Sequence, residues 1–218
     1  MYTKEDFMED VDVDHEKFDS EASEDEIEEA VENLEANGFD VKVVDSSDEA
    51  LEEIKGKIPE EASVMNGHST TLEEIGFMEY LNEGDHDWES LPGKIWSIDD
   101  DEKRNEERRK ATTADYFLGS VNGVAREDGS LVAADLSGSR IGAYPFAAGN
   151  VIIVTGVNKI VKDIEEARDR LWEYAYEFEN ERAQEEYGVE SAVAKEFLYH
   201  AESGDRTTVI LVKEKLGF

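Results

Sequence analysis

The chain has 218 residues, enough for one sizeable domain that buries a core without covalent or metal staples. It carries 56 Asp and Glu against 22 Lys and Arg, a net charge of -34, yet 39% of its residues are hydrophobic and recur in periodic blocks, which argues against disorder. Because there is no cysteine, disulfides, thiolate nucleophiles and cysteine-ligated zinc or iron–sulfur centres are excluded for this chain.

The negative charge is spread over the polar side of almost every predicted helix, as a solvated shell would be. This pattern resembles halophilic, archaeal-like cytoplasmic proteins, in which molar salt shortens the Debye length to about 3 Å and screens the repulsion. A broad basic face for nucleic acid is missing, and neither a signal peptide nor a membrane-spanning apolar run is visible. We therefore expect a cytoplasmic protein with no nucleic-acid partner and no membrane insertion.

Two parts of the chain are expected, an acidic N-terminal arm at residues 1–22 and a single domain at residues 23–218. The arm lacks clear periodicity and is predicted to be loosely ordered unless Phe7, Met8 and Phe18 dock it. The first half of the domain alternates helices and strands, which predicts a parallel sheet built with a crossover connection. The expected elements are a helix capped by Ser23 and Glu26, the strand 39–45, a helix capped by Ser46 and Glu49, the strand 62–65 and a helix through Leu81.

The second half of the domain contains further elements of both kinds. A charged helix is predicted at about residues 99–113, and two apolar runs around Glu127-Asp128-Gly129 indicate a β-hairpin. The four branched residues at 151–154 are typical of a central strand buried on both faces. A long helix at 163–187, a short helix within 188–204 and a last strand in "TTVILV" complete an α/β fold with a mostly parallel sheet and flanking helices.

The stretch "VMNGHSTTLEE" places polar residues directly after a predicted strand. In a parallel sheet this position lies at the carboxyl edge, where ligands bind. The candidate ligand-binding residues here are Asn66, Gly67, His68, Ser69 and Thr70. A simpler interpretation is that Thr70 and Glu73 form a capping box that starts the next helix and needs no ligand.

Three sequence blocks carry a resemblance to a known family. The blocks are "ASVMNGHSTTLEEIGF", "ADYFLGSVNGVAREDGSLVAADLSGSRIGAYPFAAGNVIIVTGVNKIVKDIEEA" and "RTTVILVKEKLGF". In order and spacing they resemble the LUD domain family, the lactate-utilisation proteins of the C type, over residue 25 to the end. The resemblance implies a fold of the ribose-phosphate isomerase, CoA-transferase and formyltetrahydrofolate cyclo-ligase type, and a role in lactate oxidation beside iron–sulfur partner proteins.

The hairpin supplies a second group of candidate residues. Many relatives carry Glu-Thr-Gly at its turn, whereas this chain has Glu127-Asp128-Gly129 and so lacks the threonine hydroxyl. Glu127 is a candidate base or nucleophile, although Asp-Gly is also ordinary turn chemistry. Ser120 and Asn122 share one face of the preceding strand as ligand contacts or internal hydrogen-bond partners, and Gly123 permits close approach.

Asn158 and Lys159 follow the predicted central strand, so they too are expected at the carboxyl edge of the sheet. Lys159 is a candidate catalytic residue and partner for a carboxylate or phosphate, the alternative being a pair with one of the many nearby acids. A basic cluster, Lys103 to Lys110, is better explained by charge complementarity at the end of a helix than by a docking site.

Three functions remain open at this point. The first is an accessory protein of lactate utilisation that binds a small anionic metabolite in a cleft and acts with iron–sulfur partners. The second is a free-standing enzyme on a sugar-phosphate or acyl-CoA type substrate, in which Glu127 acts as base or nucleophile and Lys159 holds the anion. The third is a non-catalytic ligand-binding module. No metal site is expected, any other cofactor is undetermined, and a homodimer stays open.

Overall fold

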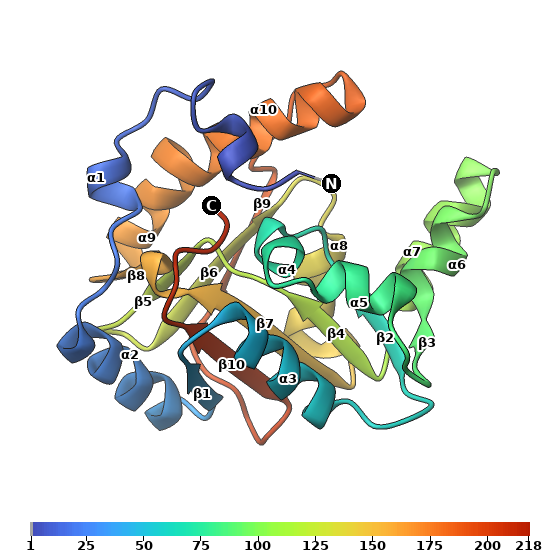
Figure 1. Ribbon diagram of the computed structural model, residues 1–218, viewed down its shortest axis with the longest axis horizontal. Helices are drawn as coiled ribbons and strands as arrows, with labels where there is room; N and C mark the ends of the chain where they lie inside the picture. The colour runs from blue at the N-terminus through green and yellow to red at the C-terminus, as the bar shows by residue number, and fades with distance from the viewer. Residues whose placement is uncertain (1) are drawn as a thin grey trace.

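The computed structural model describes residues 2–218 and is centred on a six-stranded parallel sheet, visible in the middle of Figure 1. The strand order is β1-β10-β7-β4-β2-β3, and every neighbouring pair is parallel. The strands are β1 (Asp40–Val44), β2 (Ser63–Asn66), β3 (Glu89–Ser90), β4 (Tyr116–Gly119), β7 (Asn150–Gly156) and β10 (Thr207–Val212). The expected α/β fold with a mostly parallel sheet is confirmed.

A second, four-stranded sheet contains the predicted hairpin. Its order is β8-β5-β6-β9, with β8 (Ile160–Val161), β5 (Gly123–Ala125), β6 (Ser130–Asp135) and β9 (Lys195–Tyr199). The short helix predicted within 188–204 is wrong, because β9 runs antiparallel to β6 there. The edge of the hairpin offers β9 a complete ladder of backbone hydrogen bonds, and this tertiary pairing overrides the local helical pattern.

Two helices begin where their predicted capping residues place them. Ser23 and Glu26 form a reciprocal capping box at the start of α2 (Glu24–Ala36), and Ser46 caps α3 (Ser47–Lys57). The predicted long helix consists of α9 (Ile164–Arg170), a π-helical turn η4 (Leu171–Ala175) and α10 (Tyr176–Tyr187). The remaining helices are η1 (Glu5–Phe7), α1 (His15–Phe18), α4 (Thr70–Glu74), α5 (Phe77–Glu83), α6 (Leu91–Trp96), α7 (Asp101–Ala111), α8 (Ser139–Gly142), η2 (Ala143–Ala147) and η3 (Val157–Lys159). Within residues 2–218, no helix combines the length and apolar character needed to cross a membrane.

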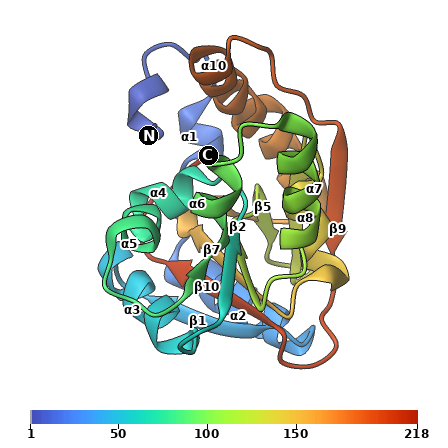
Figure 2. The same ribbon diagram turned by 90° about the vertical axis from the view of Figure 1, so that its right-hand side faces the viewer.

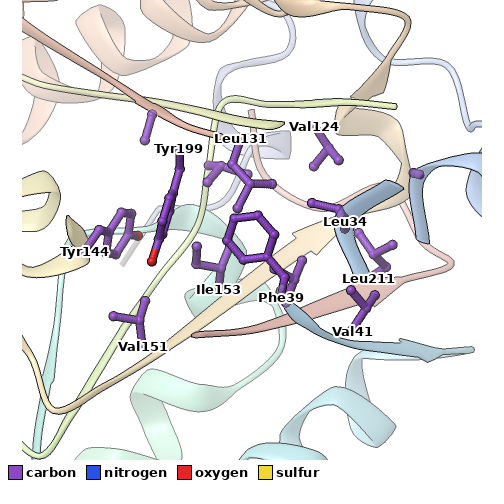
Figure 3. Close-up of a cluster of buried hydrophobic side chains, with 14 of the residues drawn as sticks. Leu34, Phe39, Val41, Val124, Leu131, Tyr144, Val151, Ile153, Tyr199 and Leu211 are labelled. Atoms are coloured by element: carbon purple, nitrogen blue, oxygen red, sulfur yellow. The ribbon is translucent and has the colours of Figure 1, made fainter. Parts of the chain in front are cut away.

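Both faces of the central strand β7 are buried, as predicted. Val151 and Ile153 face the core between the six-stranded sheet, α2 and the hairpin, which Figure 3 shows in close-up. Ile152 and Val154 point to the opposite core, beneath α3, α4 and α5. Because successive side chains point to opposite buried faces, the four residues between Asn150 and Thr155 are all apolar.

The described part of the arm packs against the middle of the long helix, around η4. Phe7 and Phe18 are buried with Tyr174 and Phe178, whereas Met8 is exposed; Met1 lies outside the described residues. Phe218 stacks on Phe178 with 5.3 Å between ring centroids. Both views place the C-terminal residues beside the arm and α4 (Figures 1 and 2). The two ends of the chain therefore lie over the carboxyl edge of the parallel sheet.

Candidate functional site

Lys159 is the centre of the polar group at this edge. It ends η3 directly after β7, and its side chain is almost fully buried, with 2% of the residue exposed. Its Nζ donates hydrogen bonds to Thr71 Oγ1 at 3.0 Å and Ser120 Oγ at 3.3 Å. The three parallel strands β2, β4 and β7 are neighbours, so the segments that follow them meet here, as the topology rule predicts.

Two arginines that no sequence pattern distinguishes extend this group. Arg170 of α9 is completely buried, and it donates from Nε to the Phe18 carbonyl at 3.0 Å and from Nη1 to the Asn122 carbonyl at 2.7 Å. Its Nη2 has no hydrogen-bond partner. Arg140 of α8 donates from Nη2 to the Ala134 carbonyl at 2.6 Å. We call Lys159, Thr71, Ser120, Arg140 and Arg170 the Lys159 cluster.

Burial shapes the charges of the cluster. It holds the pKa of Lys159 well below the ordinary value, and the positive charge of Arg170 acts in the same direction. Burial also lowers the pKa of Arg170 to about 10. Among residues 2–218, neither side chain has a carboxylate within salt-bridge distance. Lys159 and Arg170 are thus buried basic groups without a salt-bridge partner, in a chain of net charge -34, whereas Arg140 pairs with Asp135 at 3.5 Å.

The loop between β2 and α4 contributes hydroxyl and amide groups, but its helix cap differs from the prediction. The N-cap is Ser69, whose Oγ accepts a hydrogen bond from the Leu72 amide, so the proposed Thr70 and Glu73 capping box is wrong by one residue. The helix starts one residue earlier because Ser69 has the extended backbone that a cap requires. Thr70 Oγ1 is consequently buried without a partner, as is Asn66 Oδ1.

Gly67 and His68 occupy different surroundings in the same loop. A Cβ at Gly67 would lie only 2.8 Å from Arg140 Cγ, so the glycine lets the arginine side chain pack across the loop. His68 is exposed. Surrounding protein lowers the pKa of His68 below its ordinary value, and the charge of Arg182 acts in the same direction. His68 is therefore a neutral group at the outer rim of the loop.

Internal contacts account for three of the candidate residues, two through hydrogen bonds and one through close packing. Asn122 Oδ1 accepts from the Ala134 amide at 2.9 Å, within the hairpin sheet. Gly123 allows α9 to approach, because a Cβ there would lie 2.8 Å from the Ala167 Cβ. Asn158 accepts from the Leu216 amide at 3.0 Å and donates to Asp19. For Asn122 the alternative of an internal hydrogen-bond partner, left open by the sequence, describes the structure.

Glu127 lies apart from the Lys159 cluster. In the second sheet Val124 pairs with Ile160, so the preceding residues, Gly123 and Lys159, lie at the same height along the strands. Glu127 follows Gly123 by four residues and lies at the tip of the hairpin. Its side chain is exposed, and its amide donates to the Lys162 carbonyl at 3.0 Å. The turn packs on the end of α2, where Asn37 donates to the carbonyls of Asp128 and Gly129. These contacts assign the hairpin turn a structural role.

The N-terminal arm and the C-terminal residues cover the cluster. Glu74 accepts hydrogen bonds from the Lys4 amide at 2.9 Å and from the Gly217 amide at 2.6 Å, so one carboxylate holds both ends of the chain. A Cβ at Gly217 would lie 3.1 Å from Lys159 Nζ. Two surface hollows, of about 350 Å³ beside α6 and α7 and about 380 Å³ beside α3, contain no residue of the cluster. The Lys159 cluster is therefore covered and has no open cavity at the two hollows.

Comparison with known proteins agrees with this architecture. A family model described as the LUD domain matches residues 27–190. The chain belongs to the LUD domain family. The LUD family is associated with lactate utilisation, and the matched range includes all five residues of the Lys159 cluster, from Thr71 to Arg170.

A solved structure and the curated proteins complete the comparison. The LUD chain is similar to a crystal structure of a DUF162 family protein from Deinococcus radiodurans, with a TM-score of 0.52 and 13% identity over 86% of this chain and 96% of that chain. At this identity the likeness shows the fold. None of the curated proteins matches the sequence. Within residues 2–218, no group of three or more His, Asp or Glu side chains is placed to hold a metal ion.

Proposed function

We propose that this LUD protein is an accessory component of lactate utilisation that binds a small monocarboxylate at the Lys159 cluster. The observation that carries the proposal is that Lys159 and Arg170 are buried basic side chains without a carboxylate partner among residues 2–218. A buried cation without a counter-charge costs several kcal/mol. An anionic ligand would remove this cost, and the unpartnered Thr70 Oγ1 in the adjoining loop can donate a further hydrogen bond.

The charge balance favours a small ligand with one negative charge. Glu73 and Glu74 occupy the end of α4, and acidic residues cover the surface, so a polyphosphate would meet strong repulsion. A carboxylate can accept two hydrogen bonds from a guanidinium or ammonium group. Lactate and related short hydroxy or oxo acids fit this requirement, and their association with the family agrees with it.

Calorimetric titration of lactate, acetate and phosphate into the protein in concentrated potassium chloride tests the proposal. We expect the monocarboxylates to bind more tightly than phosphate. Lys159→Met should weaken binding at least about tenfold, the loss expected for one charge-assisted hydrogen bond of about 1.5–3 kcal/mol. Lys162→Met is the matched control, because Lys162 is nearby in sequence and exposed. Equal binding by the two variants, or no binding by the wild type, would overturn the proposal.

The partners are the second part of the proposal. Since the chain has no cysteine, we infer that the redox centres of lactate oxidation lie on iron–sulfur proteins that associate with it. Purification of the tagged protein at high salt from cells that produce it, followed by iron and sulfide analysis, tests this inference. Co-purification of an iron–sulfur protein supports an accessory role, whereas purification of the chain alone favours the free-standing enzyme or the simple binding module.

A further inference from the structure

The surroundings of Lys159 suit a neutral amine as well as an ammonium group. Nζ contacts the hydroxyls of Thr71 and Ser120, and each hydroxyl can accept or donate a hydrogen bond. No carboxylate of residues 2–218 lies within salt-bridge distance of Nζ, and burial and the charge of Arg170 oppose the ammonium form more strongly than the more distant Glu74 favours it. A desolvated lysine beside a second cationic group is the environment in which lysine becomes a nucleophile toward carbonyl compounds.

We infer that Lys159 forms a reversible imine with the carbonyl carbon of a small 2-oxo acid whose carboxylate binds the unpartnered Nη2 of Arg170. The inference rests on the proposed function, because the same cluster must first bind a monocarboxylate, and it specifies the ligand class as an acid with a carbonyl next to the carboxylate. Arg170 is fixed by its two backbone acceptors, the carbonyls of Phe18 and Asn122, so its third nitrogen can receive the ligand without rearrangement of the other two.

The hydroxyls beside Nζ supply the proton transfers that the reaction requires. Nζ attacks the carbonyl carbon and forms a C–N bond, while one amine hydrogen passes through Thr71 or Ser120 to the carbonyl oxygen. The resulting hydroxyl then leaves with the second amine hydrogen as water, and a C=N bond remains. One amine and one carbonyl thus give one imine and one water, with no oxidant or reductant.

Access to Nζ requires movement of the C-terminal residues. Gly217 lies against both Thr71 and Lys159, and it is held by the hydrogen bond from its amide to Glu74. Asn158 binds the adjacent Leu216 amide at 3.0 Å. Replacement of Glu74 by Gln should loosen this cover and speed imine formation, because a neutral amide accepts the Gly217 and Lys4 amides more weakly than a carboxylate does.

The test uses the full chain in concentrated potassium chloride with pyruvate as the probe, followed by borohydride reduction and mass mapping of the modified lysines. We expect the reduced adduct on Lys159 at a level at least about tenfold above that on Lys162, since each unit of lowered pKa raises the neutral-amine fraction about tenfold. Lactate, which lacks the ketone carbonyl, should compete with pyruvate for the site but should form no adduct with Lys159. Acetone, which lacks the carboxylate, should label Lys159 far less. Arg170→Met should reduce labelling by pyruvate, whereas Arg168→Met, a change of an exposed arginine on the same helix, should not.

The outcomes separate the two proposals. Adduct concentrated on Lys159 and lost in Arg170→Met supports the imine. Calorimetric binding of pyruvate without a trapped adduct, or labelling of Lys159 no greater than that of Lys162, overturns the imine and leaves monocarboxylate binding intact. Absence of both binding and adduct overturns both. If Arg170→Met does not fold, the comparison of pyruvate with acetone on the wild type decides the role of the carboxylate.

Discussion

The side-chain amide of Asn158 donates a hydrogen bond of 2.7 Å to the carboxylate of Asp19. This contact joins the residue before Lys159 to the N-terminal arm, and the same carboxylate binds Lys4 Nζ at 2.9 Å in a buried ion pair. The arm is therefore anchored by a charge network at the edge of the candidate site. Both these polar contacts and the aromatic packing of Phe7 and Phe18 attach the arm to the domain.

Breaking this network should destabilise the protein. Asp19→Ala leaves Lys4 buried without its partner, and we expect the free energy of unfolding to fall by about 3–5 kcal/mol in urea titrations at high salt. Glu173→Ala is the control, because it removes an exposed pair with Lys17 and should cost less than about 1 kcal/mol. Similar losses in the free energy of unfolding of the two variants would show that the Asp19 network stabilises the fold no more than an exposed ion pair does.

Glu73 should give the protein a distinct pH dependence. Burial raises the pKa of Glu73 from 4.5 to about 7, so the folded state holds a proton that the unfolded state releases between these values. The contribution of Glu73 to the free energy of unfolding is therefore fully present below pH 4.5, and it is lost as the pH rises to about 7. Over this pH range the melting temperature of the wild type should fall, whereas that of Glu73→Gln should not show this fall. Glu79→Gln, at an exposed position of α5, should keep it; parallel curves for all three proteins would contradict the assignment.

The central strand should not tolerate a charge. Ile153 is fully buried in the core of Figure 3, and Ile153→Asp would place an unpaired carboxylate there, so we expect no soluble folded protein. Ile153→Val, which removes one methyl group from the same site, should cost about 0.5–1.5 kcal/mol. Soluble yield and circular dichroism measure the difference. A folded aspartate variant of near-native stability would be incompatible with a central β7.

Salt should stabilise the fold strongly. The charge of -34 is distributed over the surface, and screening of its self-repulsion predicts that the melting temperature rises by many degrees between dilute buffer and molar potassium chloride. Choline chloride at equal ionic strength should act similarly, because screening does not depend on the cation. A flat or falling melting temperature would contradict the halophilic interpretation.

Local patterns determined most elements and the position of the candidate loops. Ser23 with Glu26 and Ser46 with Glu49 fixed two helix starts, because a cap satisfies backbone amides within one turn and needs no distant partner. The apolar run at 151–154 identified the central strand, since burial on both faces leaves no polar position. Lys159 was expected at the carboxyl edge because it follows the central strand, and Ser120 was singled out by its alternation with Asn122; the two side chains meet at this edge.

Only the tertiary structure decided which side chains complete the site. Arg140 and Arg170 lie on helices far along the chain from the β2 loop, and nothing in their local sequence distinguishes them from arginines paired at the surface. β9 exists because β6 offers it a backbone ladder, and Glu127 is separated from Lys159 by the length of a hairpin whose register the sequence does not specify. Cover of Lys159 by Gly217 and the arm likewise depends on contacts between the two ends of the chain, which short-range patterns do not encode. Local chemistry thus set the elements and their capping, whereas long-range packing set the burial and the unpaired charges from which the proposed ligand was inferred.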